Sequence, residues 1–186
     1  MQIKQILTNY ATLDDSALTE RSRFGDAEAF AELYRRYLNP VYRFLFKRTG
    51  GNVALAEDFT SQVFLEALDN LPKYRDRGRF AAWLFTIARH RLTDYYRKTR
   101  MDFLDKIPES LPGVSDDLED RENMARLKQL LTALDYEKRE LLQLRFTAEL
   151  SFADMAAALG RSEASVKMSL YRVLDWLRGQ WEAGNE

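Results

Sequence analysis

The chain has 186 residues, a formal net charge of −1, no cysteine and one histidine. This composition excludes disulfides, thiolate metal cages and cysteine nucleophiles, and it argues against a histidine-based metal site or catalytic triad. No apolar run approaches the ~18 residues of a membrane span, and residues 1–10 lack a secretory layout, so we expect a cytoplasmic protein without cofactor. Abundant Leu, Ala, Arg and Glu favour an all-α fold.

The first predicted elements are two long helices. Asp26 is placed to cap a helix, and apolar residues recur after it at helical spacing: Ala29, Phe30, Leu33, Tyr34 and Tyr37. Asn39-Pro40 predicts an interruption, because proline lacks the amide hydrogen that a helix needs. The pattern resumes until Gly50-Gly51, and Asn52 then caps a second helix that runs through Leu71.

The helix predicted after Asn52 carries a polar stripe along one face. Its members recur every three or four residues: Asp58, Gln62, Glu66 and Asp69. Phe59, Val63, Phe64 and Leu68 are expected to serve as core. Such a stripe is most often a solvated face. It also suits docking of a basic partner helix, because charge complementarity steers association and register.

A basic loop and a basic helix come next. From Lys73 to Arg100, nine basic residues stand against two acidic ones, a net charge of +7. On the predicted helix 80–98, one face collects Arg89, Thr93, Tyr96, Arg97 and Arg100. Cations bind phosphates and aromatic rings stack on bases, so this face suits locally opened nucleic acid. The alternative is a solvated cationic face whose aromatic residues are core.

Residues 101–122 predict a flexible acidic linker. They hold eight acidic and two basic residues, a net charge of −6, together with Pro108, Pro112 and Gly113. Fully extended, 22 residues reach about 75 Å at ~3.3–3.6 Å each. We therefore predict two small helical domains on a tether.

The second domain is predicted to end in a helix-turn-helix. A short helix follows Ser151, Gly160 suits the left-handed turn, and Ser162 can cap the last helix. A helical wheel places Leu170 toward the core, while Arg161, Ser165, Met168 and Arg172 face outward. Such a helix can enter a major groove. An ordinary helical hairpin with solvated basic residues stays an equal alternative on this motif alone.

The order of these motifs resembles an extracytoplasmic-function (ECF) sigma factor, a small bacterial RNA polymerase specificity subunit. The resemblance covers about residues 15–178 and is carried by the segments 25–30, 56–64, 80–98, 134–140 and 150–178. It implies an N-terminal extension at 1–14, sigma region 2 at 15–100, the linker at 101–122 and sigma region 4 at 123–183.

The resemblance also implies roles for residues. Those expected to bind polymerase are Glu57, Asp58, Gln62 and Glu66. Those expected to read and melt the −10 element are Lys73, Arg75, Arg77, Arg79, Trp83, Arg89, Thr93, Tyr96, Arg97 and Arg100. Those expected to bind the −35 element are Arg161, Ser162, Ser165, Lys167, Met168, Ser169 and Arg172.

The partners so implied are core RNA polymerase and promoter DNA, and the class leaves room for an anti-sigma factor. No catalytic residue is expected, since the polymerase performs the chemistry. One alternative is a stand-alone helix-turn-helix regulator with an N-terminal sensor domain. Another is a helical enzyme or scaffold, against which the missing metal, nucleophile and phosphate-loop motifs count.

Overall fold

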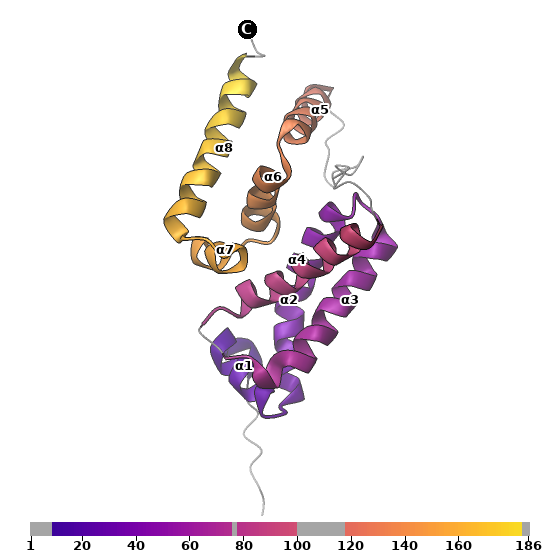
Figure 1. Ribbon diagram of the computed structural model, residues 1–186, viewed down its shortest axis with the longest axis vertical. Coiled ribbons are helices and arrows are strands. Elements are labelled where there is room, and N and C mark those ends of the chain that lie inside the picture. Colours follow the sequence, from indigo (N-terminus) through magenta and orange to yellow (C-terminus); the bar gives the residue numbers. More distant parts are fainter. Residues whose placement is uncertain (1–8, 76–77, 100–117, 184–186) are drawn as a thin grey trace, which may run out of the picture.

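The computed structural model describes residues 9–75, 78–99 and 118–183, and these ranges contain helices and turns but no strand. The N-terminal part comprises η1 (Tyr10–Thr12), α1 (Asp15–Arg23), α2 (Ala27–Arg48), α3 (Val53–Asn70), η2 (Leu71–Lys73) and α4 (Phe80–Thr99). The C-terminal part comprises α5 (Leu118–Ala133), α6 (Tyr136–Leu142), the π-helical turn η3 (Gln143–Thr147), α7 (Phe152–Leu159) and α8 (Glu163–Ala183). Figure 1 shows the two parts stacked along the long axis. Within these ranges, no helix combines the length and apolar character needed to cross a bilayer.

The predicted caps of the N-terminal helices are present. The Asp26 carboxylate accepts a hydrogen bond from the amide of Ala29 at 3.2 Å, and the Asn52 side chain accepts one from Leu55 at 3.0 Å. The predicted interruption at Asn39-Pro40 is wrong, because α2 continues through Pro40. A helix-interior proline costs about 3 kcal/mol, and burial of the apolar face of α2 outweighs that cost.

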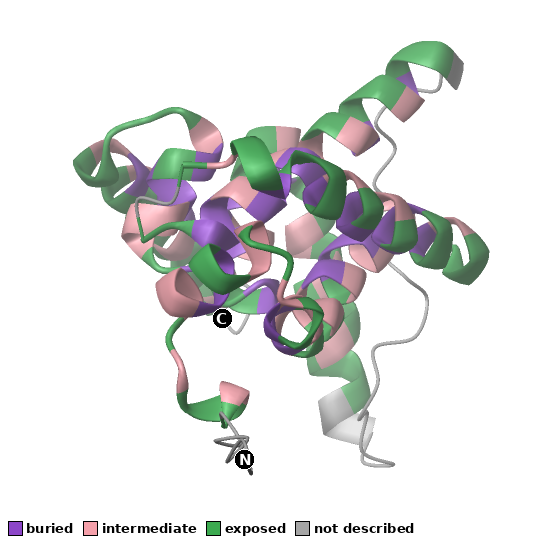
Figure 2. Cartoon of the chain, turned by 90° about the horizontal axis from the view of Figure 1, so that it is seen from below, coloured by how far each residue is buried: buried purple, intermediate pink, exposed green. Residues whose placement is uncertain are grey.

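The core of the N-terminal part lies between α2, α3 and α4. Its most buried side chains include Leu33, Phe44, Val63, Leu84 and Phe85, none of which has measurable exposure. The rings of Phe44 and Phe85 meet edge to face with centroids 5.4 Å apart. Figure 2 shows that buried residues gather where the helices face one another, while the outward faces are exposed. This bundle holds the polar stripe of α3 and the basic residues of α4 on a rigid support.

The C-terminal part has the predicted helix-turn-helix. The Ser151 hydroxyl accepts from the amide of Asp154 at 3.1 Å and caps α7, which ends at Gly160 with a φ of 65°. The Ser162 hydroxyl accepts from the amide of Ser165 at 3.2 Å at the start of α8. Met155, Val166 and Leu170 fill the space between the two helices and are buried. The sequence pattern therefore located both helices and the turn.

The two parts of the chain pack directly against each other. Helix α7 lies on α4, and α2 contacts η3, as the stacking in Figure 1 indicates. Buried residues of both parts form one continuous core cluster. Helix α5 begins at Leu118, inside the range predicted as linker, and residues 101–117 of that prediction lie outside the described residues.

Candidate nucleic-acid interface

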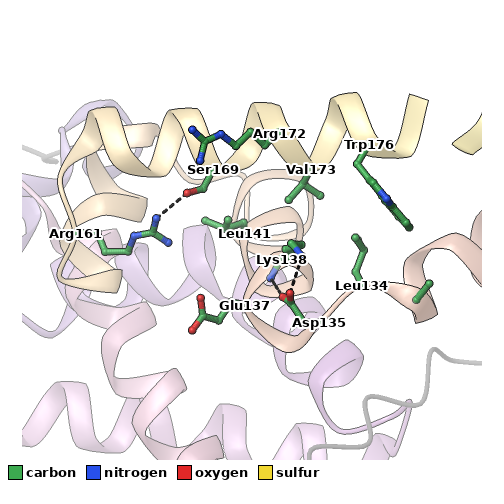
Figure 3. Close-up of a pocket in the computed structure, with 11 residues that line it drawn as sticks. Leu134, Asp135, Glu137, Lys138, Leu141, Arg161, Ser169, Arg172, Val173 and Trp176 are labelled. Atoms are coloured by element: carbon green, nitrogen blue, oxygen red, sulfur yellow. Dashed lines mark hydrogen bonds and ion pairs between the residues drawn. The ribbon is translucent and has the colours of Figure 1, made fainter. Parts of the chain in front are cut away.

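The outward face of α8 is polar, and an arginine from the turn before the helix lies along it. The Arg161 guanidinium donates to the Ser165 hydroxyl at 2.9 Å and to the Ser169 hydroxyl at 2.7 Å, and Figure 3 shows it reaching toward Ser169. Arg172 and Met168 are exposed, Met168 to 54%. These residues combine cations, hydroxyls and one apolar contact, which are the groups that read base edges in a major groove.

A cleft of about 480 Å³ runs along this face between α6 and α8. Arg161, Ser169 and Arg172 line its α8 side, and Asp135 and Lys138 line the opposite side, as Figure 3 shows. Asp135 pairs with the Lys138 ammonium at 2.8 Å, and the hydrogen bonds from the Lys138 side chain and amide hold the pKa of Asp135 below its usual range. The ion pair neutralises Lys138, so the free positive charge lining this cleft comes from Arg161 and Arg172.

Lys167 lies at the side of this face. Its ammonium is exposed and sits 5.9 Å from the Phe152 ring centroid and 6.0 Å from that of Tyr171. A lysine on the flank of a reading helix is placed for a phosphate rather than a base. Ser162, in contrast, is engaged as the cap of α8.

The basic loop before α4 carries its cations on the surface. Lys73, Arg75 and Arg79 are exposed, whereas Arg77 lies outside the described residues, as does Arg100 at the far end of α4. Beside them, the ring of Trp83 stacks on Tyr74 with centroids 4.3 Å apart and an interplanar angle of 22°. Cations around a flat aromatic surface are a feature of single-strand binding sites.

Tyr96 does not lie on the predicted nucleic-acid face. It is only 7% exposed, its ring contacts Tyr95 at 5.4 Å, and its hydroxyl donates to the backbone carbonyl of Arg48. The expectation that it stacks on a base is therefore corrected. The wheel placed it opposite the core of its own bundle, but the end of α2 covers that side of α4.

Arg89 does not lie on a solvated face either, because its side chain contacts α6 and α7. Its side chain is 25% exposed and its Nε donates to Glu140 of α6 at 2.8 Å. A second guanidinium nitrogen donates to the carbonyl of Ala158 in α7. Further along α4, Thr93 and Arg97 stay exposed, and Arg97 pairs with Asp94 at 2.9 Å.

The polar stripe of α3 is on the surface as predicted. Glu57 and Asp58 are exposed, and the Gln62 amide donates to Asp58 at 2.8 Å. Glu66 is engaged within the chain, since it accepts from Arg91 Nε at 2.6 Å. With Glu66 paired, Asp58 and Asp69 are the exposed acids of the stripe, and Glu57 beside it is exposed as well.

Two leucines that flank this stripe went unrecognised as surface residues. Leu65 is 62% exposed, and Leu68, predicted as core, is 46% exposed. Leu65 stands three residues after Gln62 and four before Asp69, so helical spacing already placed it on the polar face. Exposed leucines among acidic residues form a surface suited to a partner with both basic and apolar groups.

The same two parts of the chain match two known families. Residues 33–101 match Sigma-70 region 2, and residues 124–177 match Sigma-70 region 4. The ECF RNA polymerase sigma factor SigM of Bacillus subtilis is 30% identical over 159 residues, which cover 82% of this chain and 95% of SigM. The chain belongs to the ECF RNA polymerase sigma factors.

Other relatives agree with this sigma factor assignment. The ECF sigma factor BldN of Streptomyces coelicolor is 36% identical over 165 residues, which cover 84% of this chain and 62% of BldN. The chain thus spans less than two thirds of that relative. Among solved structures, CnrH in complex with the cytosolic domain of CnrY aligns with a TM-score of 0.62 and 24% identity, over 91% of this chain and 97% of that chain. That likeness is one of fold.

The sigma factor and all-α predictions are confirmed, and a stand-alone regulator is not favoured. In sigma factor terms, α3 and α4 belong to region 2, and α6, α7 and α8 belong to region 4. The polar stripe and the basic helix thus fall in one region, and the helix-turn-helix falls in the other. Among the described residues, no cluster of His, Asp and Glu could hold a metal ion.

Proposed function

We propose that this chain binds core RNA polymerase and promoter DNA and directs promoter-specific initiation by reading the −35 and −10 elements and opening the duplex. The observation that carries the proposal is the presence of regions 2 and 4 in one chain. Each region carries its own exposed cations, in the loop before α4 and on α8. Two separate cationic faces suit a protein that grips one DNA molecule at two places.

Region 2 has two roles in this proposal. The α3 surface around Glu57 and Asp58, with Gln62, Glu66 and the flanking leucines, docks on polymerase. The loop cations and the Trp83–Tyr74 stack, with Thr93 and Arg97, hold the opened −10 strand. Two observations support these roles. The loop cations are exposed, and stacking of a base on an aromatic side chain is worth about 1–3 kcal/mol.

Region 4 supplies the upstream contact in this proposal. Arg161, Ser165, Ser169, Met168 and Arg172 face base edges, and Lys167 binds a phosphate. The two serine hydroxyls hold the Arg161 side chain in place before DNA arrives. An ordered guanidinium loses less conformational freedom on binding, which favours its use in recognition.

The proposal leaves bond making to the polymerase. The chain supplies promoter choice and strand opening, carries no catalytic residue, and acts in the cytoplasm where the polymerase works. The structure of CnrH holds the cytosolic domain of CnrY, and an anti-sigma factor that binds this chain is also part of the proposal.

Run-off transcription with purified core polymerase tests the proposal. We expect specific transcripts from genomic templates only when this chain is added, and sequencing their starts gives the promoter. Asp58→Arg should abolish most of this activity and weaken polymerase binding, because it reverses the exposed charge of α3. Glu182→Arg, also exposed but at the far end of α8, is the matched control. Transcripts that form without the chain, or full activity of Asp58→Arg, would contradict the proposal.

Arg172→Ala should weaken upstream-element recognition by about 1–3 kcal/mol, roughly five- to 150-fold in affinity. The reason is loss of a guanidinium placed for a guanine edge or a phosphate. The measurement is holoenzyme binding to promoters with intact or scrambled upstream elements. Arg178→Ala removes an arginine that is 72% exposed and lies further along α8, and it should leave affinity unchanged. An Arg172→Ala defect confined to strand opening would argue against this role.

A further inference from the structure

An aromatic cluster supports the Trp83–Tyr74 stack, which the proposed function assigns to the −10 strand. Phe80, the first residue of α4, is only 1% exposed. Its ring contacts both members of the stack, with its centroid 5.7 Å from that of Trp83 and 6.3 Å from that of Tyr74. The ring of Tyr37 in α2 lies against Phe80 in turn, with centroids 5.5 Å apart. Phe80 therefore connects the stack to α2.

The Tyr37 side chain is fixed by a hydrogen bond as well as by packing. Its hydroxyl donates to the carboxylate of Asp15, the first residue of α1. Burial and this hydrogen bond raise the pKa of the Tyr37 hydroxyl, so the group stays protonated and donates at neutral pH. A tyrosine that is packed along its ring and bonded at its hydroxyl is held at both ends. Helix α1 thus sets the direction of the ring that contacts Phe80.

Asp15 is itself held in place by Arg36 of α2. Nη1 of Arg36 donates to the other carboxylate oxygen of Asp15 at 2.8 Å. Nη2 donates to the backbone carbonyls of Leu13 at 2.8 Å and Ala11 at 3.1 Å. Hydrogen bonds between ionised groups are strong, and the planar guanidinium fixes their direction. The acceptor of the Tyr37 hydroxyl therefore has little freedom to move.

Helix α1 also lies next to the chain that leads into α4. Gly78 has a φ of 68°, and the Ser16 hydroxyl oxygen lies 3.9 Å from where a Cβ on that glycine would sit. Helix α1 contacts both η2 and α4. The residues of η1 and α1 precede the range 33–101 that matches region 2, so the match gives them no role. Their position suits a support for the aromatic cluster.

We propose that Asp15 and Tyr37 are positioning residues for strand opening. Their hydrogen bond holds Phe80 and, through it, the Trp83–Tyr74 stack, in the orientation that accepts an unstacked base. This inference rests on the proposed function, because it takes the stack as a contact of the −10 strand. Neither positioning residue touches DNA. A stack that is already oriented loses less conformational freedom when a base binds, which favours opening of the duplex.

Fluorescence of the free chain measures the positioning itself. The chain has three tryptophans, and Trp176→Phe with Trp181→Phe leaves Trp83 as the only one. In this background, Tyr37→Phe removes the hydroxyl and keeps the ring. We expect acrylamide to quench Trp83 about twofold more strongly, because the loosened stack opens more often. Asp15→Ala should have the same effect, and adding it to Tyr37→Phe should change nothing further.

Tyr10→Phe is the matched control. The Tyr10 hydroxyl also donates to an aspartate, Asp26 of the α2 cap, at 3.0 Å. Its ring lies instead by Arg21, whose guanidinium carbon is 6.0 Å from the ring centroid. Both substitutions remove one hydroxyl and one tyrosine–aspartate hydrogen bond, so a general loss of stability affects both variants alike. Quenching of Trp83 should stay unchanged in Tyr10→Phe.

Binding of fork DNA by the holoenzyme measures the consequence for function. The probe is the promoter found by run-off transcription, kept duplex upstream and single-stranded across the −10 element. Tyr37→Phe should weaken binding about fivefold, the lower end of the effect of losing one stacked base, and Tyr10→Phe should bind as the wild type does. In a Trp83→Ala background, Tyr37→Phe should cause no further loss, because the stack that it positions is already gone.

The outcomes keep this inference apart from the proposed function. A wild-type holoenzyme that fails to transcribe or to bind the fork overturns the proposed function, and with it this role in strand opening. If the wild type binds the fork, then unchanged quenching in Tyr37→Phe, or losses equal to those of Tyr10→Phe, overturn the positioning role alone. Losses from Tyr37→Phe and Trp83→Ala that add in full overturn it as well.

Discussion

Phe44→Ala is expected to lower the free energy of unfolding by about 3–5 kcal/mol. Phe44 has no exposed surface and packs edge to face on Phe85 of α4. Its removal leaves a cavity between α2 and α4 that the rigid bundle cannot fill. Since small domains are stable by only about 5–15 kcal/mol, this loss is a large share of the total stability. Urea unfolding followed by circular dichroism measures the change.

Phe24→Ala is the control for this prediction, because the same substitution is made where the ring is 83% exposed. A change within about 0.5 kcal/mol is expected there. If both variants cost the same, then the loss at Phe44 would not come from the buried contact. Transcription at low temperature should survive in Phe24→Ala and fall in Phe44→Ala, because only the latter disturbs the support of α4.

The second large effect concerns the buried Arg48–Tyr136 contact. A cation over an aromatic face is worth about 2 kcal/mol or more when water is excluded, and Arg48 is fully buried with its guanidinium carbon 3.8 Å from the ring centroid. We expect a coupling energy of about 2 kcal/mol in a double-mutant cycle of Arg48→Met and Tyr136→Leu. Urea unfolding of the four chains measures it.

The coupling is the informative quantity here. Replacing a buried cation by an apolar side chain removes a desolvation cost as well as a contact, so the single variant alone is ambiguous. Arg48→Lys keeps the charge but loses the flat guanidinium, and it should retain only part of the coupling. Effects of Arg48→Met and Tyr136→Leu that add within about 0.5 kcal/mol would mean that the contact contributes nothing to the union of the regions.

Together, these contacts describe a sigma factor whose two regions are individually built for DNA and are held together by arginines. Three of the arginines that join them, Arg43, Arg48 and Arg89, come from region 2 and meet acidic or aromatic groups of region 4. Cations suited to nucleic acid also suit an internal carboxylate.

The features that depend on neighbouring residues in the chain could be predicted from the sequence. The helices and the helix-turn-helix could be predicted because their signals act within a few residues of chain. These signals are the capping side chains of Asp26 and Asn52, the left-handed Gly160 and the apolar spacing of α8. The ordered motifs also predicted the family. Pro40 led to the wrong prediction of a helix break. A proline inside a helix does destabilise it locally, but burial of the surrounding helix face outweighs that cost.

The sequence could not predict the burial of side chains that contact distant segments of the chain. A helical wheel tells which residues share a face but not what covers that face, so Tyr96 was predicted to be exposed although α2 covers it. Arg89 has the same spacing as the solvated cations, yet a carboxylate 51 residues further along the chain holds it. Long-range packing sets burial, and burial sets which charges can meet DNA.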